Sequence, residues 1–302
     1  MEFGKSWQLN EVDYTFPETD LQNIEILKNF RINNKPTVFL GTTGWGNSEW
    51  VGEYYQSKNP KHFLEEYGRQ LNTIELNTSF YRIPSLETLQ RWYHQTPADF
   101  KFCPKVFKPI SHGGFSNKSY SYMDTFIETF QILKGKLGPS FIQIPEYWTA
   151  EHLPVLLDFL KKYHKEFELA IELRHFSWFE DSNFRHELAD ILSSLNVTWL
   201  MTDVAGRRDV LPMLLTGPKA MIRFVGNELH PTDFIRINAW IKKILFWLEH
   251  GIEEVYFFVH QPSILKSPEL MRILEKEIKA SMDVNIRGPK RVDHGADQMT
   301  LF

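Results

Sequence analysis

The 302-residue sequence contains one cysteine, no long apolar run and no basic leader segment. Its single thiol, Cys103, cannot form an intramolecular disulfide, and no CxxC pair is present to hold zinc. The amino-terminal MEFGKSWQLN has no basic region followed by an apolar stretch, and no later run is long enough to cross a bilayer. These absences exclude a disulfide-rich secreted scaffold, and we expect a soluble, cytoplasmic protein without a membrane partner.

A strong excess of one charge is also missing. The chain has 34 Lys and Arg against 38 Asp and Glu, a formal net charge of −4. This balance disfavours a bulk positive field that would coat nucleic acid without specificity, so any anion recognition must be local. Hydrophobic residues make up 42% of the chain and charged residues 24%, which excludes disorder and provides for a large core.

From residue 37 onward, short β-rich runs alternate with longer amphipathic segments. The eight β-rich runs are residues 37–43, 73–79, 100–106, 140–144, 168–173, 197–203, 220–225 and 254–260. Eight strand-then-helix units with right-handed crossovers predict an α/β fold, a single-domain (β/α)8 TIM barrel over residues 37–280. Residues 1–36 are expected to form an N-terminal extension with a helix near 18–30, and residues 281–302 a flexible polar C-terminal tail.

An open doubly wound sheet is the alternative fold. It usually carries a GxGxxG loop after the first strand, and residues 41–46 (GTTGWG) lack that spacing, so dinucleotide binding is not favoured. Side-chain caps and prolines mark the starts of several predicted helices. The marked starts are Asn59 before Pro60, Ser85, Thr149, Ser182, and Ser267 before Pro268.

Polar side chains fall late in nearly every predicted strand. The carboxyl ends of barrel strands meet at one face, where active sites lie, so we expect these side chains to surround a polar cavity. A competing interpretation is that the charged members neutralise one another in an internal salt-bridge network, which is a poor source of stability. The residues are Glu75, Asn77, Lys105, Gln143, Glu172, Arg174, Asp203, Arg223 and His260.

Three of these residues are the candidate catalytic groups. Glu75 and Glu172 could face each other as a carboxylate pair for acid and base catalysis. Lys105 could act as an amine nucleophile or as an anion ligand, and we prefer the anion ligand, in a clamp with arginines. The predicted substrate-binding residues are Asn77, Tyr81, Gln143, Arg174, His175, Trp178, Asp203, Arg223, His260 and Trp45.

No cofactor can be assigned from spacing. A divalent metal is conceivable, because carboxylate and imidazole groups hold Mg²⁺, Mn²⁺ or Zn²⁺, but no motif such as HExxH supports one. The residues of suitable type are Glu75, Glu172, Asp203 and His260.

Aromatic residues crowd the loops after the predicted strands. Flat rings around a polar mouth suit sugars or bases, although the same rings could pack the loops onto the helices. They are Trp45, Trp50, Phe80, Tyr81, Tyr147, Trp148, Phe176, Trp178 and Phe179.

Several segments of the chain closely resemble the YecE-like family called domain of unknown function 72. They are residues 41–45 (GTTGW), 72–85 (NTIELNTSFYRIPS), 100–105 (FKFCPK), 141–145 (FIQIP) and 171–178 (IELRHFSW). The match covers about residues 37–262 in the same order, and its ELNTSFYRIPS and ELRHFSW segments are highly specific. The resemblance implies a TIM barrel and assigns no activity.

Two elements depart from the family pattern. The family usually has an Arg-x-His-Gly element on the seventh strand, where residues 223–226 read RFVG. The eighth strand usually ends in asparagines, where residues 259–261 read VHQ. No role is therefore carried over to these two strands.

The last five residues, QMTLF, look like the short sliding-clamp-binding peptide of bacterial replication and repair proteins. Such a peptide anchors by a glutamine and a terminal Leu-Phe, here Gln298, Leu301 and Phe302. An apolar pair at the end of a polar tail cannot easily reach a core, which favours a partner-binding role.

Two functions of different classes follow from these observations. The first is a hydrolase-like enzyme that acts on a phosphorylated or sugar-containing substrate, nucleic acid included, at the carboxyl face of the barrel. It rests on the charged residues, the aromatic mouth and a barrel similarity that is analogy only. The second is a non-catalytic anion-binding or adaptor barrel, recruited through its C-terminal peptide.

Overall fold

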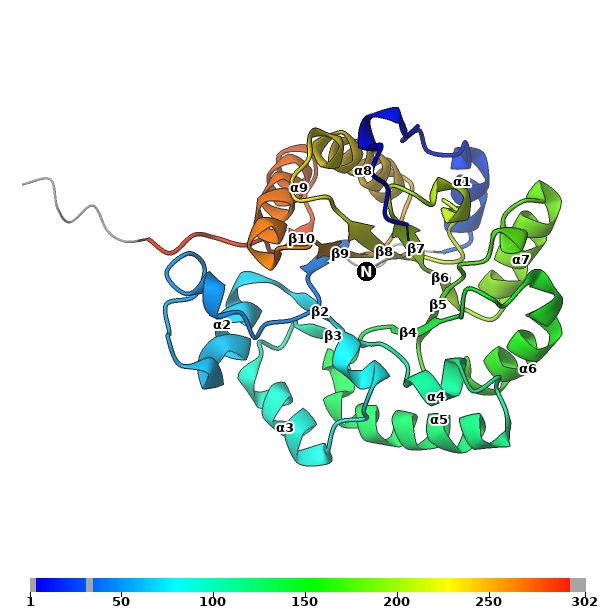
Figure 1. Ribbon diagram of the computed structural model, residues 1–302, viewed down its shortest axis with the longest axis horizontal. Helices are drawn as coiled ribbons and strands as arrows, with labels where there is room; N and C mark the ends of the chain where they lie inside the picture. The colour runs from blue at the N-terminus through cyan, green and yellow to red at the C-terminus, as the bar shows by residue number, and fades with distance from the viewer. Residues whose placement is uncertain (1–3, 31–34, 294–302) are drawn as a thin grey trace, which may run out of the picture.

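A computed structural model describes residues 4–30 and 35–293, with strands at the centre and helices outside (Figure 1). The helices are α1 (Asp20–Lys28), α2 (Phe63–Gln70), α3 (Leu86–Gln95), α4 (Lys108–Ser111), α5 (Asn117–Phe130), α6 (Leu153–Tyr163), α7 (Ser182–Ser194), α8 (Pro231–Glu249) and α9 (Ser267–Ser281). The strands are β1 (Thr37–Gly41), β2 (Thr73–Leu76), β3 (Lys101–Pro104), β4 (Ser140–Gln143), β5 (Leu169–Glu172), β6 (Thr198–Trp199), β7 (Met201–Asp203), β8 (Lys219–Val225), β9 (Glu254–His260) and β10 (Asn285–Ile286). None of the helices in these two ranges has the length and apolar character needed to span a bilayer.

The strands form an α/β fold with three sheets, ordered β10-β1-β9-β8-β7, β2-β3 and β4-β5-β6, and every strand pair in the described ranges is parallel. All eight predicted β-rich runs contain a strand, and the run at 197–203 is divided into β6 and β7 at Leu200. The expected closed barrel would be one continuous sheet. The division has a local reason at β3, because Pro104 carries no N–H for a ladder.

Single contacts join the three sheets. Lys105, just beyond β3, forms a bridge with Phe141 of β4. The backbone N–H of Glu75 in β2 donates to the carbonyl of Thr42, directly after β1, at 3.0 Å.

Side chains along the strands alternate between two buried clusters, as the pleat requires. A large cluster fills the space between strands and helices. A second cluster faces away from the helices and consists of Phe39, Cys103, Phe141, Ala170, Leu200, Met221, Tyr256 and Phe258. We call it the inner apolar layer. Two residues further toward the carboxyl ends come Lys105, Gln143, Glu172, Thr202, Arg223 and His260.

The segment that precedes β1 packs against the loop after β7. Thr19 Oγ1 and the Asn23 amide both donate to the carbonyl of Met213, at 2.6 and 3.0 Å. The Gly206 N–H donates to the carbonyl of Gly4 at 2.7 Å. Figure 1 looks onto the carboxyl ends of the strands, and the dark-blue segment that begins at Gly4 lies beside the ends of β7 and β8.

The predicted helix starts are confirmed in part. Asn59 and Ser85 each accept a backbone N–H at a helix start. Asp181, rather than Ser182, caps α7, since its carboxylate accepts a backbone N–H while Ser182 is the first helical residue. Ser267 is likewise inside α9, and Thr149 makes no capping hydrogen bond.

The structure differs from the expected flexible tail over residues 281–293. Strand β10 pairs in parallel with β1, and Arg287 forms an ion pair with Asp99 at 3.0 Å. A two-residue strand is too short to produce a detectable sequence period, so the pattern gave no warning of it. Residues 294–302 lie outside the described ranges. The clamp-binding role of Gln298, Leu301 and Phe302 therefore stays a prediction.

Candidate functional site

Two glutamates and one arginine form the centre of a buried polar cluster. Arg223 of β8 donates from Nε and Nη2 to both oxygens of Glu75 in β2, at 3.0 and 2.9 Å. Its Nη1 donates to Oε2 of Glu172 in β5 at 2.9 Å. All three residues are fully buried. One guanidinium therefore joins strands from all three sheets, in the internal ion network that the competing interpretation described.

Glu172 is surrounded by donors. Its Oε1 accepts hydrogen bonds from Arg174 Nε at 2.9 Å and from Thr202 Oγ1 at 2.8 Å. Its Oε2 also accepts one from Gln143 Nε2 at 2.7 Å. Burial opposes ionisation of this carboxyl, but Arg174 and Arg223 outweigh burial and lower its pKa to about 2. Glu172 is therefore a fixed anion near neutral pH, and it has no proton to give as a general acid.

Glu75 makes a second contact, to His260 at the end of β9. His260 Nε2 lies 2.8 Å from Glu75 Oε2. Burial opposes ionisation of Glu75, but Arg223 and His260 together hold its pKa well below the usual range. An ionised carboxylate can only accept, so His260 donates to it from Nε2, and an imidazole that carries only this proton has Nδ1 as an acceptor.

A cavity of about 410 Å³ lies at this end of the strands. His260 lines it, together with the predicted residue Asn77 and with Gln261. Gly4 and Lys5 of the N-terminal segment close one side of it. The imidazole therefore borders a space large enough for a small substrate group.

Lys105 is a cation of the cluster that forms no ion pair with a carboxylate in the described ranges. Its Nζ donates to Gln143 Oε1 at 2.9 Å and lies 4.2 Å from the centroid of the Phe80 ring. Among residues 4–30 and 35–293, no carboxylate forms an ion pair with it. Burial, reinforced by Arg223, lowers the pKa of Lys105 to about 8, so the amine is still protonated at neutral pH.

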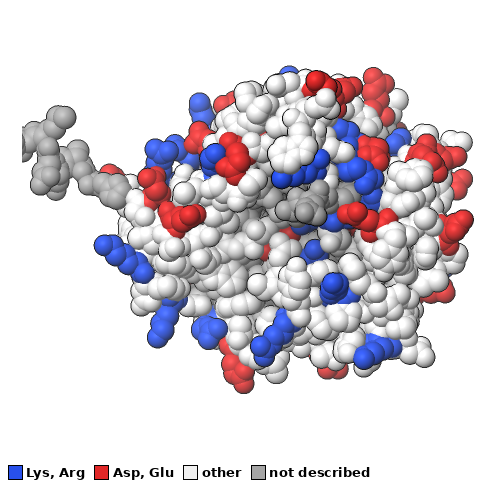
Figure 2. Space-filling model, in the orientation of Figure 1, with Lys and Arg blue, Asp and Glu red and all other residues white. Residues whose placement is uncertain are grey.

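The buried side chains of the cluster carry more positive than negative charge. Glu75 and Glu172 provide two negative charges, and Lys105, Arg174 and Arg223 provide three positive ones. A further carboxylate, on Glu146, approaches Arg174 only at 3.6 Å and is 56% exposed. Lys and Arg side chains, with some carboxylates, gather around the middle of this face (Figure 2). The local field therefore favours an anion.

The structure brings most of the predicted charged residues together. Those in direct contact within the cluster are Glu75, Lys105, Gln143, Glu172, Arg174, Arg223 and His260. It does not bring Asp203 there. Asp203 points to the helices, where it pairs with Arg236 at 3.0 Å and accepts from Trp240 Nε1 at 2.6 Å. Its neighbour Thr202 occupies the inward position instead.

Two tryptophans that were predicted to bind substrate pack against other residues of the protein instead. Trp178 is fully buried and donates to the carbonyl of Trp148 at 2.7 Å. Trp45 packs edge-on against Trp92, with ring centroids 5.0 Å apart. Both rings therefore pack loops onto the rest of the protein, which was the alternative to a role in binding. Neither forms a hydrogen bond or ring contact with the charged cluster in the described ranges.

The other two predicted binding residues lie beside the cluster. His175 follows Arg174 in the chain, and its Nδ1 accepts the backbone N–H of Ser177 at 3.2 Å. Tyr81 is 75% exposed and packs edge-on against Phe80. The sequence pattern did not indicate Thr202, and it indicated Phe80 only as one of the aromatic residues of the loops. Alternation alone leaves Thr202 and Asp203 as equal choices for the inward position, whereas nothing local marks Phe80 as the ring under Lys105.

The candidate metal ligands fall into two separate networks. Glu75 and His260 are in contact, but the carboxylate oxygens of Glu172 accept from arginines and neighbouring donors, and Asp203 lies on the helix side. In the part of the chain that the structure describes, no group of three or more His, Cys, Asp or Glu is placed to hold a metal ion.

Comparison with known proteins identifies relatives over most of the chain. A family model, "Protein of unknown function DUF72", matches residues 39–292. The UPF0759 protein YecE of Escherichia coli K12 is 27% identical over 263 residues, which cover 81% of this chain and 94% of that protein. Its counterpart in E. coli O157:H7 is 26% identical over the same shares.

Two solved structures share the fold. Both are crystal structures of a DUF72 family protein from Enterococcus faecalis V583, and both are 20% identical to this chain. The 3.10 Å structure superposes with a TM-score of 0.68 and covers 85% of this chain and all of that one. The 2.52 Å structure gives a TM-score of 0.62, with shares of 81% and 98%. The chain belongs to the DUF72 family.

Proposed function

We propose that the chain is a hydrolase that binds a phosphate-bearing substrate at the carboxyl ends of its strands. The observation that carries the proposal is Lys105, a buried cation with no carboxylate partner in the described ranges, inside a cluster of net positive charge. Such a group is costly to bury unless an anion completes it. Arg174 adds a forked guanidinium suited to phosphate oxygens.

The proposal includes closure of the three sheets into one (β/α)8 barrel. Its support is the bridge from Lys105 to Phe141, the hydrogen bond from Glu75 to Thr42, and the Arg223 guanidinium that joins β2, β5 and β8. In a closed barrel the charged cluster lines the mouth, where TIM-barrel enzymes place their chemistry.

In this mechanism Glu75 and Glu172 position other groups, in place of the acid and base pair expected from the sequence. Glu172 holds Arg174 toward the mouth, and Glu75 holds His260 with its Nδ1 as acceptor. His260 is the general base. It takes a proton from water at Nδ1, and the water oxygen attacks phosphorus while the bond from phosphorus to the leaving oxygen breaks. Lys105 balances the negative charge that develops on the phosphoryl oxygens.

The first test measures anion binding against pH. Inorganic sulfate is the probe, because its charge does not change over the range. We expect Lys105-dependent binding near pH 7 that weakens about tenfold by about pH 9, since the amine loses its proton as pH rises through a pKa of about 8. Isothermal titration calorimetry on wild type and Lys105→Ala measures both effects.

Lys279→Ala is the matched control, because Lys279 pairs with Glu275 on α9 and is a surface cation. It should bind sulfate as wild type does. Equal sulfate affinity in wild type and Lys105→Ala would contradict the anion-ligand role.

A non-catalytic anion-binding protein is the second candidate. The observation that favours it is the complete pairing of both buried carboxylates with arginines, which resembles a binding site more than an acid and base pair. Turnover of p-nitrophenyl phosphate and its diester separates the two. Sulfate binding without turnover of either ester would favour the binding protein.

A further inference from the structure

Four aromatic side chains are at least half exposed in the described ranges. They are Trp7 at 85%, Tyr81 at 75%, Tyr147 at 66% and Phe176 at 51%. The last three follow β2, β4 and β5 at the carboxyl ends of the strands. Large rings left in water and gathered on one face are typical of a binding surface.

Two of these rings contact residues that adjoin the cations of the site, and the third is close to them in the chain. The Tyr81 ring packs edge-on on Phe80, with centroids 5.2 Å apart, and Phe80 carries Lys105 on its ring. Phe176 packs against His175, the residue after Arg174, with centroids 4.5 Å apart. Tyr147 directly follows Glu146, which faces Arg174.

A basic cavity of about 520 Å³ is connected to Phe80 through one of its lining residues. His112 lines it and packs edge-on against Phe80, with ring centroids 5.4 Å apart. Lys108 and Lys118 line it as well. Burial and the nearby cations, Lys108 first, lower the pKa of His112 to about 4, as expected where positive charge accumulates.

These features follow one another around the fold. Strands β2 and β3 are paired, β3 is bridged to β4, and β4 and β5 are paired. The loops after them are therefore neighbours. We call the surface formed by Tyr81, Tyr147 and Phe176, together with Lys105 and Arg174, the aromatic arc.

We propose that the aromatic arc binds single-stranded nucleic acid, with bases stacked on the exposed rings and phosphates on Lys105, Arg174 and the basic cavity. The inference rests on the proposed function, because Lys105 and Arg174 hold one phosphate in both. Alternating rings and cations match a chain that alternates flat, apolar units with negative charges. A neutral sugar chain would leave the cations unmatched, and a duplex would hide the faces of its bases.

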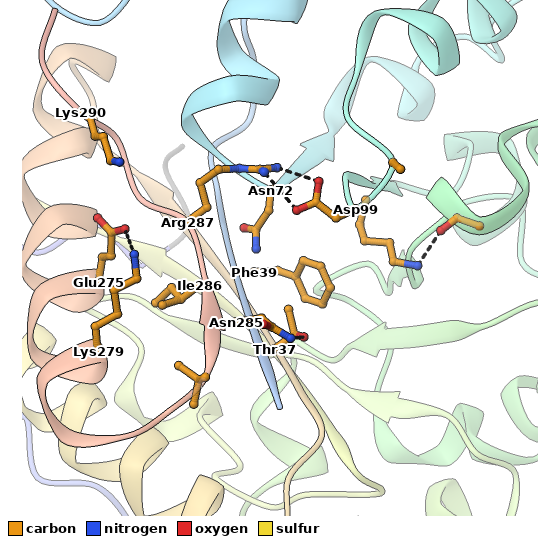
Figure 3. A pocket seen from close by; sticks show the side chains of 14 residues that line it. Thr37, Phe39, Asn72, Asp99, Glu275, Lys279, Asn285, Ile286, Arg287 and Lys290 are labelled. Atoms are coloured by element: carbon orange, nitrogen blue, oxygen red, sulfur yellow. Dashed lines mark hydrogen bonds and ion pairs between the residues drawn. The ribbon is translucent and has the colours of Figure 1, made fainter. Parts of the chain in front are cut away.

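A larger cavity at the opposite ends of the strands provides a contrast (Figure 3). Its volume is about 760 Å³, and two of the four cations that line it face carboxylates: Arg287 reaches Asp99, and Lys279 reaches Glu275. Its aromatic residue, Phe39, is buried. That cavity therefore has cations but lacks the open rings of the arc, and it supplies control positions.

The experiment measures fluorescence anisotropy of labelled oligo(dT) of about 4, 8 and 16 nucleotides, the range of single-strand site sizes. We expect affinity to rise with length and then level off. Tyr147→Ala combined with Phe176→Ala should weaken binding of the longest probe about 100-fold, whereas replacing both by Trp should preserve it. Lys108→Ala combined with Lys118→Ala should weaken binding of the oligonucleotide. It should also reduce the slope of log affinity against log salt concentration by about 0.7 for each phosphate that is no longer neutralised.

Lys279→Ala with Lys290→Ala, in the opposite cavity, should leave binding unchanged. Equal binding of oligo(dT) by wild type and by the Tyr147, Phe176 alanine variant would overturn the inference. It would also be overturned if heparin displaced oligo(dT) equally well from both proteins, because charge alone would then account for the affinity. Lys105-dependent sulfate binding without oligonucleotide binding would overturn the inference and leave the proposed function standing. Failure of both probes would overturn both.

Discussion

Replacing Arg223 by methionine is expected to lower the free energy of unfolding by about 3–5 kcal/mol, the range seen when one partner of a buried ion pair is removed. Arg223 is fully buried and satisfies Glu75 with two hydrogen bonds and Glu172 with one. Methionine leaves these oxygens without that partner in a place that water does not reach. Urea unfolding at neutral pH measures the loss.

The pH dependence of this variant should have the opposite sign to that of wild type. In wild type the pKa of Glu172 is about 2, below its ordinary value, so its stabilising contribution is present at neutral pH and lost as pH falls toward 2. Without Arg223, burial dominates at Glu75 and the folded state takes up a proton more readily than the unfolded state. The variant should therefore become more stable as pH falls from about 7 to about 5.

Arg69→Met is the matched control. Arg69 also pairs with a glutamate, Glu65, at 2.5 Å, but the two side chains are 61% and 41% exposed. Its loss should cost less than about 1 kcal/mol. If Arg223→Met lowered the free energy of unfolding no more than Arg69→Met does, water or a shift of the strands would have to satisfy the carboxylates.

Replacing His260 by alanine should lower kcat for a phosphate ester by about 100-fold to 10,000-fold, the usual contribution of a positioned general base. His260 borders the cavity and is held through Nε2 by Glu75. The fold should tolerate the change, because the imidazole is at the edge of the cluster and Arg223 keeps both glutamates. Steady-state kinetics with p-nitrophenyl phosphate provides the measurement.

Added imidazole should restore part of the activity of His260→Ala, since it can enter the space that the side chain leaves. His94→Ala, on the exposed surface of α3, is the control and should keep wild-type kcat. An unchanged kcat in His260→Ala would remove this residue from the mechanism.

The strand pattern could be predicted from the sequence, whereas one inward position was misassigned. Every predicted β-rich run contains a strand, because each run is short, bounded by turn residues and mostly rich in β-branched or aromatic side chains. Asp203 was chosen as the late polar residue of its run, yet Leu200 is inward and alternation then makes Thr202 inward. Alternation alone allows either set of residues to face inward, so the position of Leu200 in the structure decides between them.

The charged partners could not be predicted, because they are far apart in the chain. Arg223 and Glu75 are separated by 148 positions, and their contact depends on how the sheets are arranged. The polar residues at the strand ends could be recognised in the sequence as members of one cluster, but the sequence did not indicate which of them pair with each other. The same pairing decides that Glu172 is a fixed anion and that Lys105 has no carboxylate partner in the described ranges.

The inner apolar layer and the charged cluster are drawn from the same strands, two positions apart. A slip of one residue would turn every such side chain toward the helices, so the register that packs the interior also aims the binding groups. Natural variation in specificity should then be confined to the loops that carry Tyr81, Tyr147 and Phe176. The strand ends beneath these loops must both pack the interior and orient the binding groups. Ligand preference can therefore change among relatives through the loops while the strands stay the same.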